Sequence, residues 1–268
     1  MVDKIIEDII DIEIPDKDVA VLMSGGIDSL TCAFSAMRLG KKVHTYTMKV
    51  NGIDSGDSIA SKEAAKIYGW DHNEINVPID NIKEDFLKLI NDYNCKKKTQ
   101  VECAFPFLYV YPKIKQKYVL SGWAADGHYG LSKRAMIHFR YPKRLFDNFR
   151  YDYFNKENIV GILQQYKLAE ENDLTFVAPY VYEHVYNYFI TKDWDTLNKP
   201  FQKYEVVKDY PEFKRLPKVR KHENLQLCAG IPKYFEMLLN DKELNTRNRK
   251  RVMDLVRDLQ PKIQSTLF

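Results

Sequence analysis

The sequence predicts an α/β protein, in which a parallel sheet carries helices on both faces and a mostly helical C-terminal part follows. Three observations predict this class. Short apolar segments alternate with helical patterns over residues 1–130, which is the order typical of parallel sheets. Two turns rich in small residues, SGGIDS and GWAADGHYG, each directly follow an apolar segment. The composition, 45% hydrophobic and 29% charged, is that of a globular chain.

The expected elements follow from hydrophobic periodicity. Strands are predicted at 18–23, 42–48, 72–77 and 118–121. Helices are predicted at 27–39, 57–68, 81–93 and 103–116. Gly40 and Gly69 are expected to end the first two helices, and Asp57 to cap the start of the second. Helical patterns in the second half cover 143–155, 157–171, 179–190, 201–209, 231–240 and 243–258.

Several classes of protein are excluded by the sequence. No apolar run approaches the roughly 20 residues of a membrane-spanning helix, so no membrane partner is expected. The N-terminal segment is acidic and amphipathic, which does not resemble a secretory signal. The four cysteines form no CxxC pair, so a zinc or redox centre is not expected, and they are interpreted as buried small residues. Together these features predict a cytoplasmic location.

The charge is unevenly distributed along the chain. Net charge is +4, but residues 131–268 hold 25 basic and 18 acidic side chains. Such a surplus suits an anionic partner, such as nucleotide phosphates or a nucleic acid, or simply a solvated surface. Residues 131–154 also interleave basic with aromatic residues, which permits contacts with phosphates and bases. An amphipathic helix, with lysines and arginines extending over core aromatics, is the favoured interpretation of that segment.

The hexapeptide SGGIDS, residues 24–29, carries the strongest functional signal. Gly25 and Gly26 permit a tight turn that brings backbone N–H groups close to an anion. The helix that begins there favours phosphate through its free N–H groups and dipole, and Ser24 and Ser29 add hydroxyl donors. Asp28 does not favour phosphate directly, and its presence suggests that a Mg²⁺ ion lies between it and the phosphate oxygens. No GKS or GKT follows, so the loop is not a Walker A motif.

The SGGxDS pattern resembles the pyrophosphate loop of the ATP pyrophosphatase superfamily. Within it, residues 17–240 look most like the synthetase domain of asparagine synthetases and β-lactam synthetases, on the strength of VAVLMSGGIDS, PFLYVYPKIKQKYVLSGWAADGHYG and QKYEVVKDY. The resemblance implies an adenine nucleotide alpha hydrolase-like fold and use of ATP and Mg²⁺. It also implies cleavage of ATP between the α- and β-phosphates, with adenylation of a carboxylate, carbonyl or amide oxygen, after which a nucleophile displaces AMP.

The resemblance also implies roles for individual residues. Met23 and Met48 would contact the adenine nucleotide, together with Ser121, Gly122 and Trp123. Asp28 and Asp126 would be the two magnesium carboxylates. Lys221 would approach the phosphates as the catalytic lysine, although the family pattern matches there only to within one residue, and Lys203 is a second candidate for a phosphate contact. A solvated surface charge is the competing interpretation of either lysine.

Three departures limit what the resemblance implies. The chain begins at Met1-Val2 and lacks the glutaminase half of asparagine synthetases, so its nucleophile is expected to be free ammonia, a substrate amine or ammonia from a separate partner. Trp123 stands where the family has an acidic residue or tyrosine, and an indole has no basic lone pair with which to accept a proton. Gly127 and Ala124-Ala125 make the second loop smaller, so a different pocket shape is expected.

The sequence therefore predicts one domain over 1–268, with an ATP pyrophosphatase core at 17–130 and a helical substrate-side part at 131–268. The favoured function is an AMP- and pyrophosphate-forming ligase that acts on a small-molecule acceptor with ammonia or an amine. The first alternative is a nucleobase- or tRNA-modifying ATP pyrophosphatase, which would make nucleic acid a partner. The second is an ATP-binding subunit without turnover.

Overall fold

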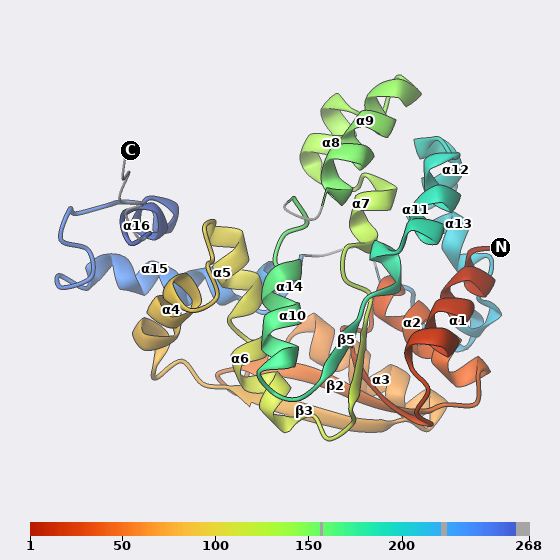
Figure 1. The fold of residues 1–268 in the computed structure, drawn as a ribbon, viewed down its shortest axis with the longest axis horizontal. Coiled ribbons are helices and arrows are strands. Elements are labelled where there is room, and N and C mark those ends of the chain that lie inside the picture. Colours follow the sequence, from red (N-terminus) through yellow and green to blue (C-terminus); the bar gives the residue numbers. More distant parts are fainter. Residues whose placement is uncertain (156–157, 221–223, 261–268) are drawn as a thin grey trace, which may run out of the picture.

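The computed structural model describes residues 1–155, 158–220 and 224–260. Its centre is a five-stranded sheet, in which every neighbouring pair is parallel and the strand order is β3-β2-β1-β4-β5 (Figure 1). The strands are β1 (Asp18–Leu22), β2 (Lys42–Val50), β3 (Asp71–Val77), β4 (Tyr118–Ser121) and β5 (Thr175–Val177). The predicted α/β class with a parallel sheet is confirmed.

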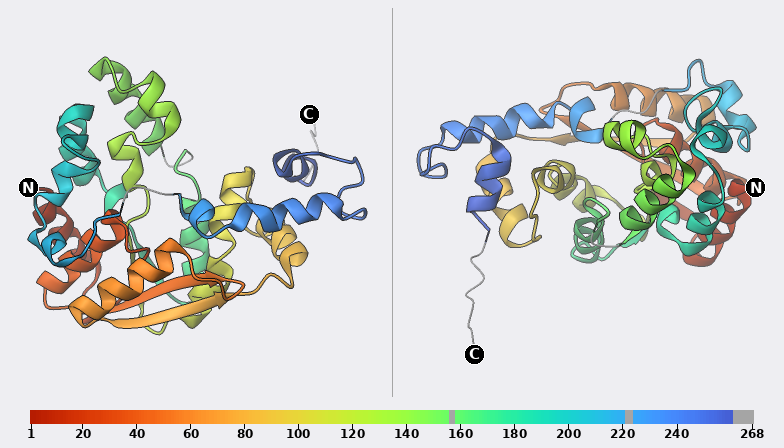
Figure 2. Two further views of the ribbon diagram at one scale, coloured as in Figure 1. Left: turned by 180° about the vertical axis from the view of Figure 1, so that it is seen from behind. Right: turned by 90° about the horizontal axis from the view of Figure 1, so that it is seen from above.

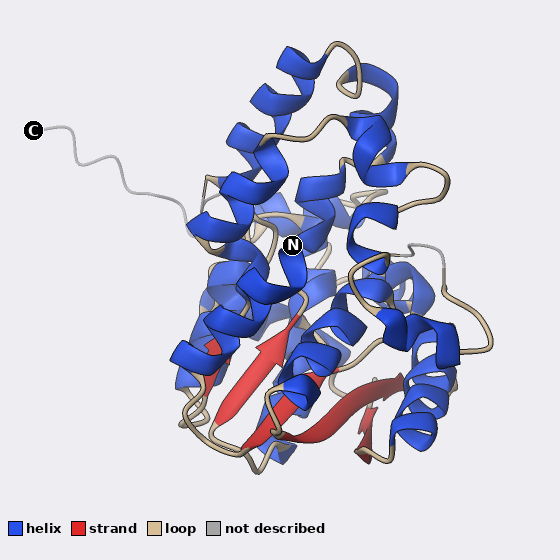
Figure 3. Cartoon of the chain, turned by 90° about the vertical axis from the view of Figure 1, so that its right-hand side faces the viewer, coloured by secondary structure: helices blue, strands red, loops and turns tan. Residues whose placement is uncertain are grey.

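Helices pack on both faces of the sheet, and the central strand shows why (Figure 3). Successive side chains of a strand point to opposite faces. Val19 and Val21 belong to one hydrophobic core, which also contains apolar residues of the N-terminal helices, whereas Ala20 and Leu22 belong to the other. All four are buried. A strand that is apolar on both faces must be covered on both faces, as parallel sheets usually are.

The helices of the first half are short and regular. They are α1 (Val2–Glu13), α2 (Ile27–Arg38), α3 (Gly56–Tyr68), α4 (Ile82–Asn91), α5 (Lys98–Ala104), α6 (Phe107–Val110) and α7 (Ala125–Tyr129), with the 3₁₀ helix η1 (Tyr111–Lys113). Gly40 and Gly69 have positive φ just beyond α2 and α3, as expected of residues that end a helix.

The second half is mostly helical, as the sequence predicts. Its helices are α8 (Lys133–His138), α9 (Lys143–Phe154), α10 (Ile162–Glu170), α11 (Glu183–Ile190), α12 (Trp194–Asn198), α13 (Tyr204–Val207), α14 (Leu225–Cys228), α15 (Ile231–Met237) and α16 (Val252–Asp258), with the 3₁₀ helices η2 (Pro179–Val181), η3 (Pro211–Arg215) and η4 (Leu238–Asn240). Figure 2 shows that the last helices form an extension on the opposite side of the molecule from the N-terminus. No helix in the described ranges is long and apolar enough to cross a bilayer.

Three expectations about local structure are wrong. The helix expected at 103–116 is divided into α5, α6 and η1, because Pro106 lacks the N–H that would continue the helix. Ser55, not Asp57, caps α3, since the Ser55 hydroxyl accepts a hydrogen bond from the Ser58 N–H. The helix expected at 243–258 begins only at Val252.

Strand β5 was not predicted, and it lies in the second half of the chain. Residues 175–177 add to the free edge of β4, with Val119 beside Phe176. Three residues are too few to produce a recognisable period-2 pattern. The sheet therefore extends beyond residues 17–130, the range expected for the ATP pyrophosphatase core.

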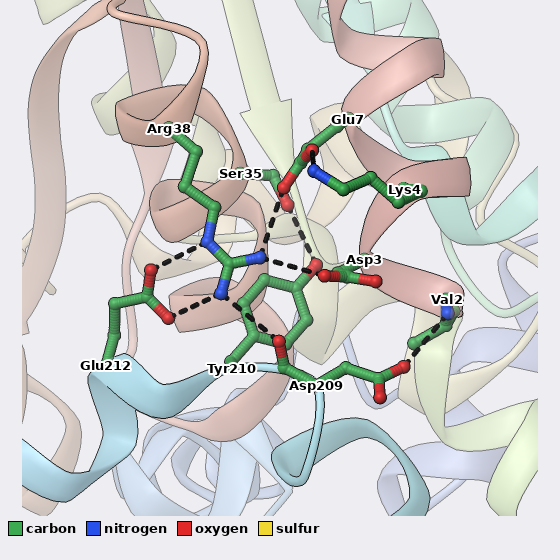
Figure 4. Close-up of polar contacts among 9 residues, drawn as sticks. All are labelled: Val2, Asp3, Lys4, Glu7, Ser35, Arg38, Asp209, Tyr210 and Glu212. Atoms are coloured by element: carbon green, nitrogen blue, oxygen red, sulfur yellow. Dashed lines mark hydrogen bonds and ion pairs between the residues drawn. The ribbon is translucent and has the colours of Figure 1, made fainter.

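Arg38, on the last turn of α2, joins three segments of the chain (Figure 4). Its guanidinium contacts Asp3 at 3.0 Å and Glu7 at 3.1 Å on α1, and Glu212 at 2.7 Å on η3. It also donates to the Asp209 carbonyl oxygen. The Glu212 hydrogen bonds make the largest contribution to a raised Arg38 pKa, which keeps the group charged although burial opposes this. The N-terminal helix and the 209–212 segment are thus held to the same face of α2.

We expect Arg38→Met to destabilise the protein by about 3 kcal/mol, because three carboxylates with little solvent exposure would lose their shared cation. Urea unfolding measures this loss. Arg251→Met is the matched control, since Arg251 forms a single ion pair with Asp254 and its side chain is 66% exposed. The control should cost less than about 1 kcal/mol. Equal losses in the two variants would contradict a special role for Arg38.

Candidate functional site

A cavity of about 1160 Å³ lies beyond the carboxyl ends of β1 and β4 and beside β2. From β1 the chain adds β2 and β3 on one side of the sheet and later adds β4 and β5 on the other side. The order in which strands are added therefore reverses between β1 and β4, although all strands are parallel. Ligands of open α/β sheets bind at such a switch point. Leu22, the last residue of β1, pairs with Ser121 at the end of β4, which brings the two small-residue turns together.

The SGGIDS loop is pre-shaped by its own hydroxyl groups. The Gly26 N–H donates to Ser24 Oγ at 3.2 Å, and Ser29 Oγ donates to the Gly26 carbonyl oxygen at 3.1 Å. The two hydroxyl oxygens are 3.1 Å apart. Gly26 directly precedes α2, so the loop presents the N-terminus of a 12-residue helix to the cavity. These are the groups that bind phosphate at helix N-termini.

Two glycines permit the close packing around this loop. A Cβ at Gly25, where φ is +68°, would lie 2.6 Å from the Ala60 Cβ of α3. A Cβ at Gly122 would lie 2.6 Å from the Asp28 carbonyl carbon. The two turns therefore contact each other through backbone, and no other residue type fits at Gly122 without a shift of one turn. Gly25 itself does not line the cavity, unlike Ser24, Gly26 and Ser29.

Asp28 and Asp126 converge on one cationic atom. Lys203 Nζ lies 2.5 Å from Asp28 Oδ2 and 2.8 Å from Asp126 Oδ1. The three residues come from α2, α7 and the position just before α13, and all three line the cavity. The two carboxylates expected to share a metal ion therefore lie close enough to share one ammonium group.

Lys203 is held in place by its surroundings. Only 3% of the residue is exposed, its φ is +64°, and its N–H donates to Asn198 Oδ1 at 3.2 Å. Its ammonium also lies 5.0 Å from the centre of the Tyr129 ring. Burial lowers the pKa of Lys203, but the charges of Asp126 and Asp28 and their hydrogen bonds outweigh it and raise the pKa above its usual value. Lys203 is therefore a buried cation of the site, not a solvated surface lysine.

The side of the cavity along β2 is apolar. Met23 and Met48 are both buried and line the cavity, together with Tyr46. The Met23 N–H donates to the Tyr46 carbonyl oxygen at 2.8 Å, which extends the β1–β2 pairing by one residue. Met48 lies within β2, which continues to Val50. Flexible thioether side chains beside a phosphate loop suit a flat, apolar ring system.

Arg220 is a cavity residue that the sequence did not single out. Its guanidinium lies 2.5 Å from Asp57 Oδ1 and 3.2 Å from the Ser24 carbonyl oxygen. A Cβ at Gly56 would lie 2.7 Å from Arg220 Nη2, so this glycine leaves the room that the guanidinium occupies. Asp57, expected as a helix cap, instead anchors this arginine. Lys221, the first candidate for the catalytic lysine, lies outside the described residues.

Comparison with known proteins now adds to this geometry. The asparagine synthase family matches residues 12–209, which include the phosphate loop, both carboxylates and Lys203. The chain belongs to the asparagine synthase family. This family is of the ATP pyrophosphatase type, so the resemblance inferred from SGGIDS is confirmed.

The curated proteins to which this chain is similar are named for reactions other than asparagine synthesis. The tRNA-specific 2-thiouridylase MnmA of Caldicellulosiruptor saccharolyticus is 27% identical over 227 residues, which is 79% of this chain and 55% of the relative. The 7-cyano-7-deazaguanine synthase of Thermoplasma acidophilum is 35% identical over 71 residues, 26% of this chain and 30% of the relative. The chain thus spans about half or less of the length of the curated relatives it matches.

Among solved structures, the chain is similar to one described as a predicted subunit of tRNA methyltransferase from Methanocaldococcus jannaschii. The TM-score is 0.38 and the sequences are 15% identical, over 78% of this chain and 94% of the other.

Trp123, which departs from the asparagine synthetase pattern, forms a wall of the cavity. Its indole N–H donates to the Val160 carbonyl oxygen at 2.9 Å, and its ring meets Phe107 edge to face at 5.8 Å between centres. The indole is thus fixed by protein contacts while still lining the cavity. Contact between this ring and the nucleotide, as expected from the sequence, stays a prediction.

Gly127, part of the third departure from the family pattern, receives a ring from α9. A Cβ at Gly127 would lie 2.2 Å from Tyr153 Cδ1, and a Cβ at Gly130 would lie 2.5 Å from Phe146 Cε2. The two glycines are three residues apart, and the two rings are seven apart on α9. The small loop therefore docks α9 against the segment that carries Asp126. A pocket shape different from that of asparagine synthetases stays a prediction.

We expect Gly122→Ala to reduce binding of Mg²⁺·ATP by at least about tenfold, because the added Cβ must separate the two turns. Isothermal titration calorimetry measures the affinity. Gly40→Ala is the control, since its φ of +72° strains the backbone of an alanine there while nothing lies within 4 Å of the new Cβ. The proposed contact between the turns is incorrect if the two variants bind ATP equally well.

His128 gives the stability a defined pH dependence. The imidazole is fully buried between the rings of Phe154 and Phe189, with Nε2 donating to the Tyr180 carbonyl oxygen. Burial lowers the pKa of His128 to about 3, so the folded state stays neutral where the unfolded imidazole takes up a proton. The contribution of His128 to the free energy of unfolding is therefore fully present above about pH 6.5 and is lost as the pH falls below that value.

We expect His128 to contribute a loss of about 2 kcal/mol in unfolding free energy between pH 7 and pH 5, which His128→Gln should remove. Urea unfolding at the two pH values measures this difference. His184→Gln, at an exposed position on α11, should leave the loss unchanged. A His128 variant that keeps the full pH dependence would show that the burial of His128 is not its source.

Proposed function

We propose that the protein cleaves ATP to AMP and pyrophosphate and adenylates a carbonyl oxygen of a nucleobase. A nitrogen nucleophile then attacks the carbon that carries this oxygen. The convergence of Asp28, Asp126 and Lys203 beside the phosphate loop carries this proposal. It combines two anionic groups and one cation with the N-terminus of α2, which is the equipment needed to hold and neutralise a polyphosphate.

The phosphates of ATP fit the loop at Ser24–Ser29. Because Ser24 and Ser29 bond to the loop itself, their hydroxyls and the loop N–H groups are already held in one place. Pre-positioned donors stabilise negative charge without a cost of reorganisation during the reaction. The apolar side at Met23 and Met48 then receives the adenine ring.

The carboxylate pair fits a magnesium ion. Asp28 Oδ2 and Asp126 Oδ1 both lie within hydrogen-bond distance of one cation, and carboxylate oxygens are ligands that Mg²⁺ prefers. Within the described ranges no cluster of three or more metal-binding side chains occurs. Two carboxylates with substrate phosphates is a usual Mg²⁺ environment. When bound, the ion would neutralise charge on the pyrophosphate.

Lys203 supplies a second positive charge at the same point. While no ion is bound, its ammonium balances Asp28 and Asp126, which otherwise would repel each other. With its buried position and raised pKa, the group remains charged. It therefore stabilises the negative charge that develops on the leaving pyrophosphate.

The part of the cavity beyond the phosphates suits a flat ring. The rings of Phe107, Trp123, Phe149 and Tyr153 line it, as do the side-chain amides of Gln202, Asn224 and Gln226. Aromatic faces stack on bases, and amides bond to base edges. The two curated relatives are named for chemistry on a base, uridine in one and a deazaguanine in the other. These features favour a nucleobase over aspartate as acceptor.

The proposed steps balance as follows. A carbonyl oxygen of the base attacks the α-phosphorus of ATP, the bond between that phosphorus and the bridging oxygen breaks, and pyrophosphate leaves with the electron pair. Ammonia or an amine then adds to the activated carbon and loses a proton, and AMP departs with the former carbonyl oxygen.

Sulfur transfer is a second candidate, suggested by the thiouridylase relative. Cys103 lines the cavity, with its Sγ 3.6 Å from Gln226 Oε1. Burial raises the pKa of this thiol to about 12, which disfavours the thiolate needed as a nucleophile. Amide formation on aspartate, as in asparagine synthetases, is a third candidate function. Trp123 disfavours it, because an indole has no group that could accept a proton from the attacking nucleophile.

We expect pyrophosphate release from Mg²⁺·ATP to be stimulated by a pool of nucleosides and RNA, and not by aspartate with ammonia. A coupled pyrophosphate assay with chromatographic detection of AMP measures this. Stoichiometric ADP would exclude the reaction altogether, and asparagine as product would replace the nucleobase with aspartate.

We expect Asp28→Asn and Asp126→Asn each to reduce pyrophosphate release at least about 100-fold, because each removes one negative ligand from the shared cation position. Asp11→Asn, an exposed carboxylate on α1, is the control and should retain activity. Circular dichroism confirms that the variants fold. Full activity in both pocket variants would remove the carboxylates from the mechanism.

We expect Lys203→Met to slow adenylation by on the order of 2–4 kcal/mol in activation free energy, while the KM for ATP changes much less. The variant should also bind Mg²⁺ more tightly without ATP, because no ammonium competes for Asp28 and Asp126. Single-turnover kinetics and calorimetry separate the two effects. Unchanged adenylation would assign Lys203 to structure alone. The equivalent expectation for Lys221→Ala, slower adenylation with similar ATP affinity, stays a prediction.

A further inference from the structure

Helices α8 and α9 and their connecting loop, residues 132–154, form what we call the basic arm. Figures 1 and 2 show it beyond α7, on the far side of α7 from the sheet. Most basic side chains of the basic arm are exposed, and Arg150 is the buried exception. Its exposed basic side chains are Lys133, Arg134, Arg140, Lys143 and Arg144.

The positive charge of the basic arm is only partly neutralised. Asp147 pairs with Lys143 at 2.7 Å and with the buried Arg150 at 2.5 Å. In the described part of the chain, no ion pair within 4 Å engages Lys133, Arg134, Arg140 or Arg144. Arg140 instead lies over the rings of Tyr141 and Trp194, and Arg134 over Phe139. The charge of Arg140 also acts on Asp195 of α12. Lys133, Arg134 and Arg144 have no ion-pair partner among the described residues, and with Arg140 they form a local anion-binding surface.

The basic arm is fixed relative to the catalytic carboxylate. Tyr153 fills the space above Gly127, and Phe146 fills the space above Gly130, both on the segment that follows Asp126. Phe146 is fully buried. Arg150 adds hydrogen bonds to the carbonyl oxygens of Phe189, Ile190 and Lys192 at the end of α11. A ligand held by the basic arm is therefore held at a defined distance from the reaction centre.

A row of rings connects the basic arm with the cavity. Phe139 stacks on Phe149 at 5.6 Å between centres, and Phe149 stacks on Tyr153 at 6.2 Å. Phe149, Tyr153 and the exposed Lys133 all line the cavity. Tyr141 and Tyr151, with 51% and 73% of the residue exposed, add two further rings to the surface of the basic arm. Cations and rings thus continue from the outer surface into the pocket.

We propose that the basic arm binds the phosphodiester backbone of a single-stranded nucleic acid, one base of which enters the cavity. The inference rests on the proposed function and names the form in which the nucleobase is presented. A base that enters a pocket must leave its stack, which is least costly in a single strand or loop. Interleaved cations and exposed rings are the features by which single strands are bound.

An acidic protein is a poorer match for the basic arm. It would satisfy the cations, but it would not account for the row of rings that leads to the phosphate loop. RNA and single-stranded DNA share the backbone chemistry, and the experiment distinguishes them.

The test measures binding of a fluorescein-labelled single-stranded RNA of about 20 nucleotides by anisotropy, between about 50 and 200 mM salt. The same sequence as DNA, the RNA in duplex form, and poly-glutamate of equal charge serve as further ligands. The arm variant is Arg134→Gln with Arg144→Gln. The control variant is Lys113→Gln with Lys115→Gln. These exposed lysines precede the N-terminal end of β4, whereas the cavity lies beyond its carboxyl end.

We expect the arm variant to bind single-stranded RNA about tenfold more weakly at 100 mM salt, with a salt slope reduced by about 1.4, since each phosphate contact contributes about 0.7. The control variant should change the affinity less than twofold. Equal effects of the two variants, absence of RNA binding by the native protein, or equal affinity for poly-glutamate would each overturn the proposal. A preference for DNA over RNA would support the basic arm as the binding surface and identify single-stranded DNA as its ligand.

Pyrophosphate release from Mg²⁺·ATP by the native protein, measured in the same preparations, separates this inference from the proposed function. RNA binding with no pyrophosphate release retains the basic arm and rejects the reaction. Pyrophosphate release stimulated by free nucleosides, with no RNA binding, retains the reaction and rejects the basic arm. Circular dichroism and thermal melting check that the arm variant folds.

Discussion

The ammonium of Lys203, placed between Asp28 and Asp126, is the interaction on which the site depends. Its two ion pairs join residues 175 and 77 positions apart in the chain. A buried lysine is unfavourable unless nearby carboxylates offset its desolvation, and two carboxylates that face the same point repel each other without a cation. The three groups are therefore stable together and not separately. Their mutual requirement ties the first loop, the second loop and the segment before α13 into one unit.

Other parts of the fold serve this arrangement. The neighbouring positions of β1 and β4 bring the two turns to the same edge, and Gly122 lets their backbones touch. Downstream of Lys203, Arg38 holds the 209–212 segment to α2, the same helix that carries Asp28. Helix α2 thus determines both the position of a carboxylate and the course of the chain that supplies its cation. Arg220 connects the phosphate loop with α3, because its guanidinium contacts both the Ser24 carbonyl oxygen and Asp57.

Local patterns in the sequence were enough to predict the parallel sheet and the position of the SGGIDS turn after its first strand. Each depends on residues close together in the chain or on a fixed rule, such as the adjacency of strand ends in a parallel sheet. That Asp126 would lie with Asp28 was implied only by the resemblance to asparagine synthetases. Contacts between distant segments were not predictable. Arg220 approaches the loop only because Gly56 is small, and Asp57 follows a serine that proved the better cap. Residues 175–177 become a strand only because β4 offers a free edge.

The glycines of the second loop have a consequence for how related sequences can vary. Tyr153 occupies the space that a side chain at Gly127 would need, and Phe146 occupies that space at Gly130. A larger residue at either glycine is compatible with the fold only if the facing ring becomes smaller in the same lineage. Positions 127 and 153, and likewise 130 and 146, should therefore change in concert. The loop that carries Asp126 and the helix that carries surface charge would then be inherited as a single module.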